Sequence, residues 1–240
     1  FGFSVRGVIY VSTSVPDTTV FIGNEIENVT GFFNKETLDD RLKPGQYLVL
    51  TANDLYWPWA KQVDVKRGEV EALFPLMVPK EVPAKEIFKT DSNYVNVSRL
   101  FARTATSTVL LGRKATTSPA TPVEFTRHHV AIWIDDNVLF GRWDGNPAGA
   151  PKYFCLHGGC INPIQLFRAY VPVRSFDFYP LRDDAVLLAL DNAVYAVEID
   201  TRLYQNFYPI YRGTAPDFRV DGGDIYIKDE GKLYLLDLEP

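Results

Sequence analysis

The chain has 240 residues, enough for one large domain or two ordinary ones. Either arrangement buries enough surface to fold without the support of disulfides or metal ions. Its net charge of −5 argues against a nucleic-acid partner, and no run approaches the ~18 apolar residues of a membrane span. Aromatic residues make up 14% of the chain, which favours strands, because aromatic side chains fit a pleated surface. All-β is therefore the predicted class.

Residues 5–80 form the most complete β unit in the sequence. Strands are predicted at 7–12, 19–22, 46–51, 61–65 and 69–74, where apolar residues alternate with polar ones or form short runs. An acidic loop is expected between the second and third of these strands. Prolines fall at turns and strand ends, where a missing N–H is tolerated, and Gly45 supplies the positive φ of a type II turn.

The motifs of this unit follow a recognisable order. They run Ser-x-Pro-acid from Ser14, Val-Phe-Ile-Gly from Val20, Leu-x-Pro-Gly-x-Tyr-x-Val from Leu42, Tyr-x-x-Trp from Tyr56 and Val-x-Val-x-x-Gly from Val63. This order resembles the PEGA domain, a small β-sandwich of prokaryotic envelope and surface proteins. The resemblance covers about a third of the chain. The namesake Pro-Glu-Gly-Ala appears here as Pro16-Asp-Thr-Thr, so this turn must be of a different type.

The resemblance implies a buried tryptophan at Trp59 and a membrane helix just upstream of Phe1. The predicted domains are a PEGA-like β-sandwich at 1–79, a Pro-rich linker at 80–97 and a repeat region at 98–240. The linker is expected because Pro79 and Pro83, with charged neighbours, interrupt any periodicity and stiffen the chain.

The repeat region contains three predicted β-hairpins, at residues 130–140, 186–197 and 224–236. Each has Asx or Gly at its turn, as primed turns require. With Asp136, Asp191 and Asp229 taken as equivalent, the second interval is close to the roughly 40 residues of a propeller blade. The hairpins thus resemble blade-like modules. Three cannot close a ring of four to eight blades, so either a degenerate fourth lies around Thr108 or an open edge is covered by another domain or chain.

An insertion at 144–163 carries both cysteines, Cys155 and Cys160, around Leu-His-Gly-Gly. A disulfide between them is predicted, since the short Gly-Gly loop lets them approach and an exported location keeps the bond oxidised. The alternatives are free thiols, or a zinc site with His157 that lacks a fourth ligand.

Tryptophans are the candidate ligand-binding residues. Flat rings with a polar tip suit sugar faces, which makes Trp57, Trp59 and Trp143 candidates for a ligand platform. Core packing is the competing interpretation, above all for Trp59 and for Trp133, which lies in a hairpin strand.

No catalytic residue, metal site or cofactor is predicted. His128 and His129 would face opposite sides of a strand, and the carboxylates fall at turns whose backbone needs already explain them. Calcium at the turns 135–137 or 221–224 is an alternative.

The sequence therefore predicts a non-catalytic, membrane-anchored envelope protein of a prokaryote. It would present a binding or assembly surface outside the cytoplasmic membrane to a protein partner or an envelope polymer. The first alternative is a carbohydrate-binding protein or carbohydrate-active enzyme that uses the aromatic and acidic loops. The second is a subunit of a larger cell-surface assembly, in which an oligomer covers the open hairpin edge.

Overall fold

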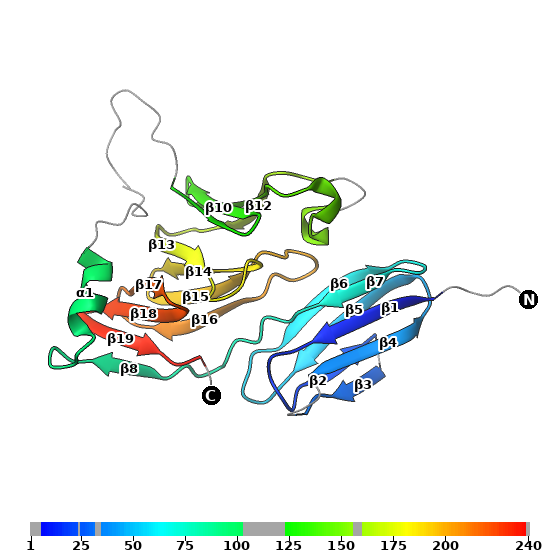
Figure 1. The fold of residues 1–240 in the computed structure, drawn as a ribbon, viewed down its shortest axis with the longest axis horizontal. Helices are drawn as coiled ribbons and strands as arrows, with labels where there is room; N and C mark the ends of the chain where they lie inside the picture. The colour runs from blue at the N-terminus through cyan, green and yellow to red at the C-terminus, as the bar shows by residue number, and fades with distance from the viewer. Residues whose placement is uncertain (1–5, 24, 32–34, 103–122, 156–159, 239–240) are drawn as a thin grey trace, which may run out of the picture. The chain divides into compact units, whose positions relative to one another are not determined.

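The computed structural model describes residues 6–23, 25–31, 35–102, 123–155 and 160–238 (Figure 1). Strands dominate these residues, with one α-helix and two short 3-10 turns, which confirms the all-β prediction. The chain divides into two compact units. The first comprises residues 1–81 and 202–206, and the second comprises residues 82–201 and 207–240. No helix among the described residues is long and apolar enough to cross a membrane.

The first unit is a sandwich of two sheets, ordered β4-β1-β7 and β3-β2-β5-β6. Its strands are β1 (Gly7–Ser12), β2 (Thr19–Ile22), β3 (Glu25–Val29), β4 (Glu36–Leu42), β5 (Gly45–Ala52), β6 (Trp59–Val65) and β7 (Val70–Leu73). The expected acidic loop is wrong, because β3 and β4 occupy most of it. Alternate residues point inward: Ile9 and Val11 on β1 and Val63 on β6 are buried, and Trp59 is only 2% exposed.

Two charged side chains lie on the inner faces of this sandwich. Lys61 on β6 has no exposed surface, and Glu71 on β7 is buried. Residues 202–206 supply partners for both: the Lys61 ammonium donates to the Tyr204 carbonyl at 2.8 Å, and Arg202 reaches Glu71 at 3.0 Å. Buried charges persist only when they are paired. The first unit is therefore completed by a segment more than a hundred residues further along the chain.

The second unit contains three four-stranded antiparallel sheets, ordered β12-β11-β10-β9, β13-β14-β15-β16 and β17-β18-β19-β8. Each predicted hairpin forms the middle pair of one sheet. The strands are β8 (Ala84–Ile87), β9 (Glu124–Arg127), β10 (Val130–Asp135), β11 (Val138–Trp143), β12 (Ile164–Arg168), β13 (Val173–Phe178), β14 (Ala185–Leu190), β15 (Ala193–Glu198), β16 (Phe207–Arg212), β17 (Asp217–Asp221), β18 (Asp224–Asp229) and β19 (Lys232–Leu236).

The hairpin turns have the left-handed residues that their sequences predict. Asp136, Asp191 and Glu230 each begin a two-residue turn with φ between 42° and 49°. Asp229 belongs to the preceding strand pair, opposite Lys232, so its alignment with Asp136 and Asp191 is off by one residue. Its side chain is consequently buried, with 7% of its surface exposed, and accepts hydrogen bonds from the Thr214 and Ala215 N–H groups.

The predicted linker at 80–97 is wrong where it overlaps a strand and a helix. Residues 84–87 form β8, which pairs with β19, and α1 (Tyr94–Ala102) begins inside the predicted range. Ile87 packs with Val97 of the helix and Leu233 of β19. Pro83 precedes the strand, where it removes no sheet hydrogen bond. The prolines favour an extended linker, but burial of Ile87 and Val97 stabilises a strand and a helix instead.

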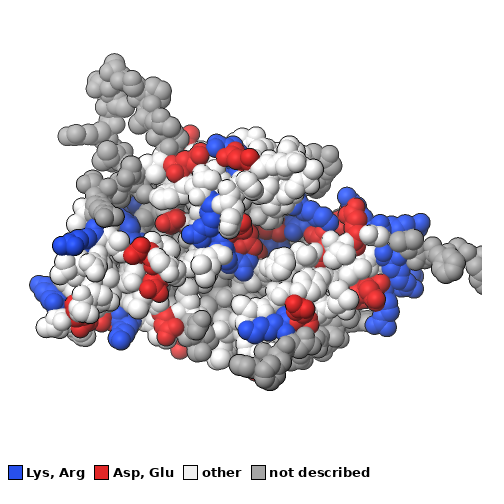
Figure 2. All heavy atoms as spheres, in the orientation of Figure 1, with Lys and Arg blue, Asp and Glu red and all other residues white. Residues whose placement is uncertain are grey.

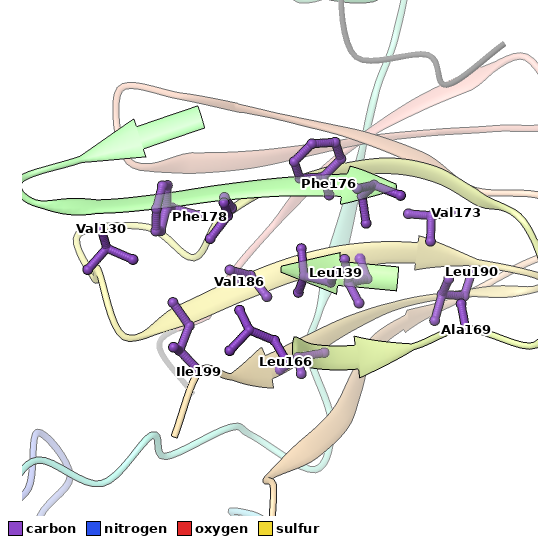
Figure 3. Packing of buried hydrophobic residues seen from close by; sticks show 14 of the residues in the cluster. Val130, Leu139, Leu166, Ala169, Val173, Phe176, Phe178, Val186, Leu190 and Ile199 are labelled. Carbon is purple, nitrogen blue, oxygen red and sulfur yellow. The ribbon is translucent and has the colours of Figure 1, made fainter. Parts of the chain in front are cut away.

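A large buried cluster lies between the first two sheets of the second unit. Figure 3 shows side chains such as Val130 and Leu139 from the first sheet meeting Phe176 and Val186 from the second. Every residue of β14 is buried. Such a strand is covered on both faces, which explains its uninterrupted apolar sequence. Fully burying one of its valine or leucine side chains stabilises the folded state by roughly 1.5–3 kcal/mol.

Arginines connect neighbouring sheets of this unit. Arg127 at the end of β9 donates to the carbonyls of Tyr179 and Arg182 at 2.7 and 2.9 Å, and Arg174 on β13 donates to the Pro216 carbonyl at 2.9 Å. Each guanidinium thus binds backbone of the next sheet along the chain. Because the donor is charged, these bonds are stronger than those between neutral groups.

Asp177 lies on β13, an edge strand of the second sheet. Burial raises its pKa above the ordinary value, while the Phe178 N–H and the charges of Arg127 and Arg219 oppose that rise. The Arg219 guanidinium on β17 also lies 5.3 Å from the centre of the Phe101 ring, so the helix packs close to this edge strand of the third sheet.

Tyr211 on β16 is expected to make the protein sensitive to alkali. Burial, together with the nearby charge of Asp229, raises the pKa of Tyr211 to about 12. Between pH 10 and 12 the Tyr211 phenol therefore stays neutral in the folded state, whereas the same phenol loses its proton in the unfolded chain. The free energy of unfolding is unaffected below pH 10 and falls as the pH rises toward 12. Tyr211→Phe should flatten this fall in urea titrations at stepped pH.

The matched control for this experiment is Tyr170→Phe, because Tyr170 is 98% exposed. The control should leave the alkaline slope unchanged. An unchanged slope in Tyr211→Phe as well contradicts the prediction.

Candidate binding surface

A row of four side chains crosses the outer face of the first sheet of the second unit. Trp133 on β10 pairs directly with Glu124 on β9 and with Phe140 on β11, and Phe140 pairs with Gln165 on β12. Ile132 and Ile134, which flank Trp133 in sequence, belong to the buried cluster. Because neighbours on a strand point to opposite faces, the row faces away from that cluster. We call these four residues the aromatic row.

The rings of the row are held in a fixed stack. Trp133 and Phe140 lie 5.6 Å apart with an interplanar angle of 16°, and the Arg142 guanidinium lies 5.4 Å from the Trp133 ring. Asp144 binds that guanidinium through two bonds of 2.6 and 2.9 Å, and Glu124 adds a third at 3.1 Å. Hydrogen bonds from Arg142 hold the pKa of Asp144 below its usual value. Arg142 and Asp144 therefore stay charged at neutral pH.

The chemistry that this surface supports is recognition. Trp133 and Phe140 are only partly buried, so the exposed part of each ring offers apolar area beside Arg142, its two carboxyl partners and the amide of Gln165. Flat aromatic faces with polar neighbours suit sugar rings or extended peptide. The Arg142 guanidinium binds both carboxyl side chains, which holds the three groups in fixed positions, as a rigid docking surface requires.

The three predicted platform tryptophans have other surroundings. Trp59 is buried in the sandwich, so its proposal as a ligand platform is wrong; its ring fills the core between the sheets. Trp57 is partly buried in the same unit. Trp143 belongs to the second unit, where its ring contacts His129 at 5.2 Å and its indole N–H donates to the Asn146 carbonyl at 3.1 Å.

Trp143 anchors the cysteine-containing insertion. The side chain of Asn162 bonds both backbone groups of Trp143, at 3.0 and 2.8 Å. A Cβ added to Gly145 would come within 2.4 Å of the indole, so only glycine fits there. Trp143 therefore joins the two ends of the insertion to β11.

Cys155 and Cys160 form a disulfide, as predicted. The free-thiol and zinc alternatives are wrong for these two sulfur atoms, because a disulfide has no thiolate to offer a metal. His157 lies outside the described residues. The disulfide closes the insertion next to Phe154. Phe154 is 1% exposed and packs in the buried cluster between the first two sheets of the second unit.

The two remaining histidines do not converge on a site. His128 Nδ1 lies 3.0 Å from Asp183 Oδ2 on an exposed surface, and His129 packs on Trp143. Within the described ranges, no group of three or more potential metal ligands comes together. At the predicted calcium turns, Asp136 and Asn137 adopt positive φ, and Asp224 accepts a bond from Tyr226.

The sequence held one signal for the aromatic row. The turn at 136–137 sets the hairpin register, which places Trp133 opposite Phe140. The pairing of Glu124 and Gln165 with them was not visible, since β9 and β12 carry weak strand patterns. No protein-family model matches this chain, and a search of curated proteins finds no match either.

Proposed function

We propose that this chain is a non-catalytic, membrane-anchored envelope protein of a prokaryote. It presents the aromatic row outside the cytoplasmic membrane to a protein partner or an envelope polymer. The observation that carries the proposal is the stack of Trp133 and Phe140, partly exposed and locked by Arg142. A rigid aromatic anchor beside charged groups is the composition of interaction hot spots.

The location rests on two lines of support. The disulfide between Cys155 and Cys160 favours an oxidising compartment, since cytosolic thiols are kept reduced. The resemblance of residues 5–80 to the PEGA domain adds an envelope setting and an anchor upstream of Phe1. The seven-stranded sandwich and the burial of Trp59 are consistent with that resemblance.

The second unit is proposed to be a short propeller-like array. Three antiparallel sheets of four strands follow one another, and their first strands β9, β13 and β17 are neighbours. β8, which precedes the first sheet in the chain, supplies the last strand of the third sheet and so ties the start of the unit to its end. Such an array supplies a stiff support for the aromatic row.

Binding to the envelope of the source organism tests this function. At about 0.3 M salt, which screens contacts with lipid charges, the 240-residue chain should co-sediment with purified cell envelopes. Under these conditions Trp133→Ala should weaken binding about 30-fold, as loss of a ~2 kcal/mol hot spot predicts. Tyr170→Ala removes an aromatic ring that is 98% exposed in the same unit and should have no effect. Equal binding by Trp133→Ala and the unchanged chain rejects the aromatic row as the binding surface.

A carbohydrate ligand is the second candidate, favoured by the polar flanks of the row. Soluble oligosaccharides from the envelope should then compete with envelope binding, and an enzyme would also release reducing ends.

Mass measurement at native concentration tests the alternative that the chain is a subunit of a larger assembly. This alternative predicts an oligomer rather than a single monomer.

A further inference from the structure

Five exposed basic residues gather at one end of the first unit. β1 and β7 begin at this end and β4 and β6 finish there, since Gly7 pairs with Leu42, Val8 with Val70, and Gly45 with Val65. The residues next to these positions are Arg6, Arg41, Lys43, Lys66 and Arg67. Arg6 donates to the Arg41 carbonyl and accepts from Gly68, which holds the chain segments together. Figure 2 shows Lys and Arg concentrated at this end of the unit.

The end keeps a positive charge although the whole chain carries −5. Asp40, Asp64 and Glu69 are the exposed carboxylates closest in sequence to the five cations, which leaves an excess of two positive charges. Of the eight Lys and Arg residues between positions 1 and 81, five lie at this end. The charge is thus segregated along the sandwich.

An apolar strip continues from the basic end over the outer face of the β4-β1-β7 sheet. Val8 pairs with Val70, and the next row joins Leu38, Tyr10 and Ala72. Val70 and Leu38 are 58% and 62% exposed, and Phe74 beyond them is 55% exposed. The outward face of a half-buried sheet is ordinarily polar, so this strip needs an explanation.

We propose that this end of the sandwich docks onto an anionic lipid surface. Cations would contact the lipid phosphates, and Val8, Val70 and Leu38 would rest against the boundary of the acyl chains. Apolar side chains beside Lys and Arg are the combination that interfacial membrane binding uses. A duplex nucleic acid offers the anionic charge without an apolar layer, so it leaves the strip unexplained.

The proposal concerns a surface separate from the aromatic row. Docking onto lipid agrees with the proposed anchor, because the chain enters β1 at the basic end. It does not depend on whether the aromatic row binds a partner. Trp133→Ala should therefore leave lipid binding unchanged. A loss of envelope binding with intact lipid binding, or the reverse, separates failure of one proposal from failure of the other.

Vesicle co-sedimentation of the 240-residue chain tests the lipid surface. Binding is expected to vesicles that contain phosphatidylglycerol at about 20 mM salt, to fall at about 0.3 M salt because the charges are screened, and to be weak for pure phosphatidylcholine. Lys66→Gln with Arg67→Gln should lower the affinity up to about 25-fold, roughly fivefold for each charge near the surface. Val70→Asp should lower it as well.

The matched control is Lys35→Gln with Lys80→Gln. Both lysines are exposed and lie at the opposite end of the sandwich, where β4 begins and the turn between β5 and β6 lies. Circular dichroism checks that each variant folds. Equal losses in control and test variants, no preference for anionic vesicles, unchanged binding by Val70→Asp, or equally tight binding to duplex DNA would each overturn the proposal.

Discussion

Replacing Arg202 with Met should lower the free energy of unfolding of the first unit by about 3 kcal/mol, the lower end of what removing one partner from a buried ion pair costs. The guanidinium reaches the Glu71 carboxylate at 3.0 Å, and only 5% of the Glu71 side chain is exposed. Without this cation, the carboxylate stays in the interior with much of its charge uncompensated. The variant should loosen β6 and β7 first.

Hydrogen exchange provides a local measurement of this effect. Peptides from 59–73 should exchange faster in Arg202→Met, while peptides from β14 and β15 should keep their protection. The double variant Arg202→Met with Glu71→Leu is the control, because removing both charges should recover most of the lost stability. A single variant as stable as the unchanged chain shows that the pair contributes little.

Replacing Asp229 with Ala should lower the stability of the second unit by about 3 kcal/mol, as expected when a buried ionised acceptor and its hydrogen bonds are lost. Its carboxylate accepts from the Thr214 and Ala215 N–H groups at 3.1 and 3.0 Å, and from Tyr211. It therefore fixes the loop between the second and third sheets. Alanine leaves both N–H groups without this acceptor.

Glycine 213 provides an independent probe of the same contact. A Cβ at Gly213 would lie 1.9 Å from Asp229 Oδ2, so Gly213→Ala should displace the carboxylate and destabilise the same loop. Asp191→Asn is the control, since Asp191 lies exposed in the hairpin turn of the second sheet and Asn tolerates its positive φ. Urea unfolding curves measure all three variants. Similar losses for Asp191→Asn and Asp229→Ala contradict the argument.

Local signals in the sequence correctly predicted the hairpins and the disulfide. The turns at 136–137 and 191–192 place residues that tolerate positive φ between two apolar runs. The two strands of each hairpin are therefore close to one another in the sequence. Cys155 and Cys160 are likewise five residues apart. Short separations leave few alternative partners, which is why pattern and turn chemistry sufficed.

Elements with distant partners were missed. β4 reads Glu-Thr-Leu-Asp-Asp-Arg-Leu, and only its pairing with β1 shows why Thr37 and Asp39 are buried while Leu38 is exposed. β8 resembled a linker because its partner β19 lies at the other end of the unit. A strand buries or exposes its faces according to what packs on them, and its own residues do not state this.

By itself the sequence determined the all-β class, the three hairpins, the buried Trp59 that the family resemblance implied, and the disulfide, because each depends on side-chain period, turn residues or motif order. Only the tertiary structure decided that residues 202–206 bind Lys61 and Glu71 inside the sandwich, that Trp133 and Phe140 face away from the buried cluster, and that five basic residues meet at one end. Those arrangements depend on pairing between segments far apart in the chain, and the loop closure that brings them together leaves no local pattern in the residues concerned.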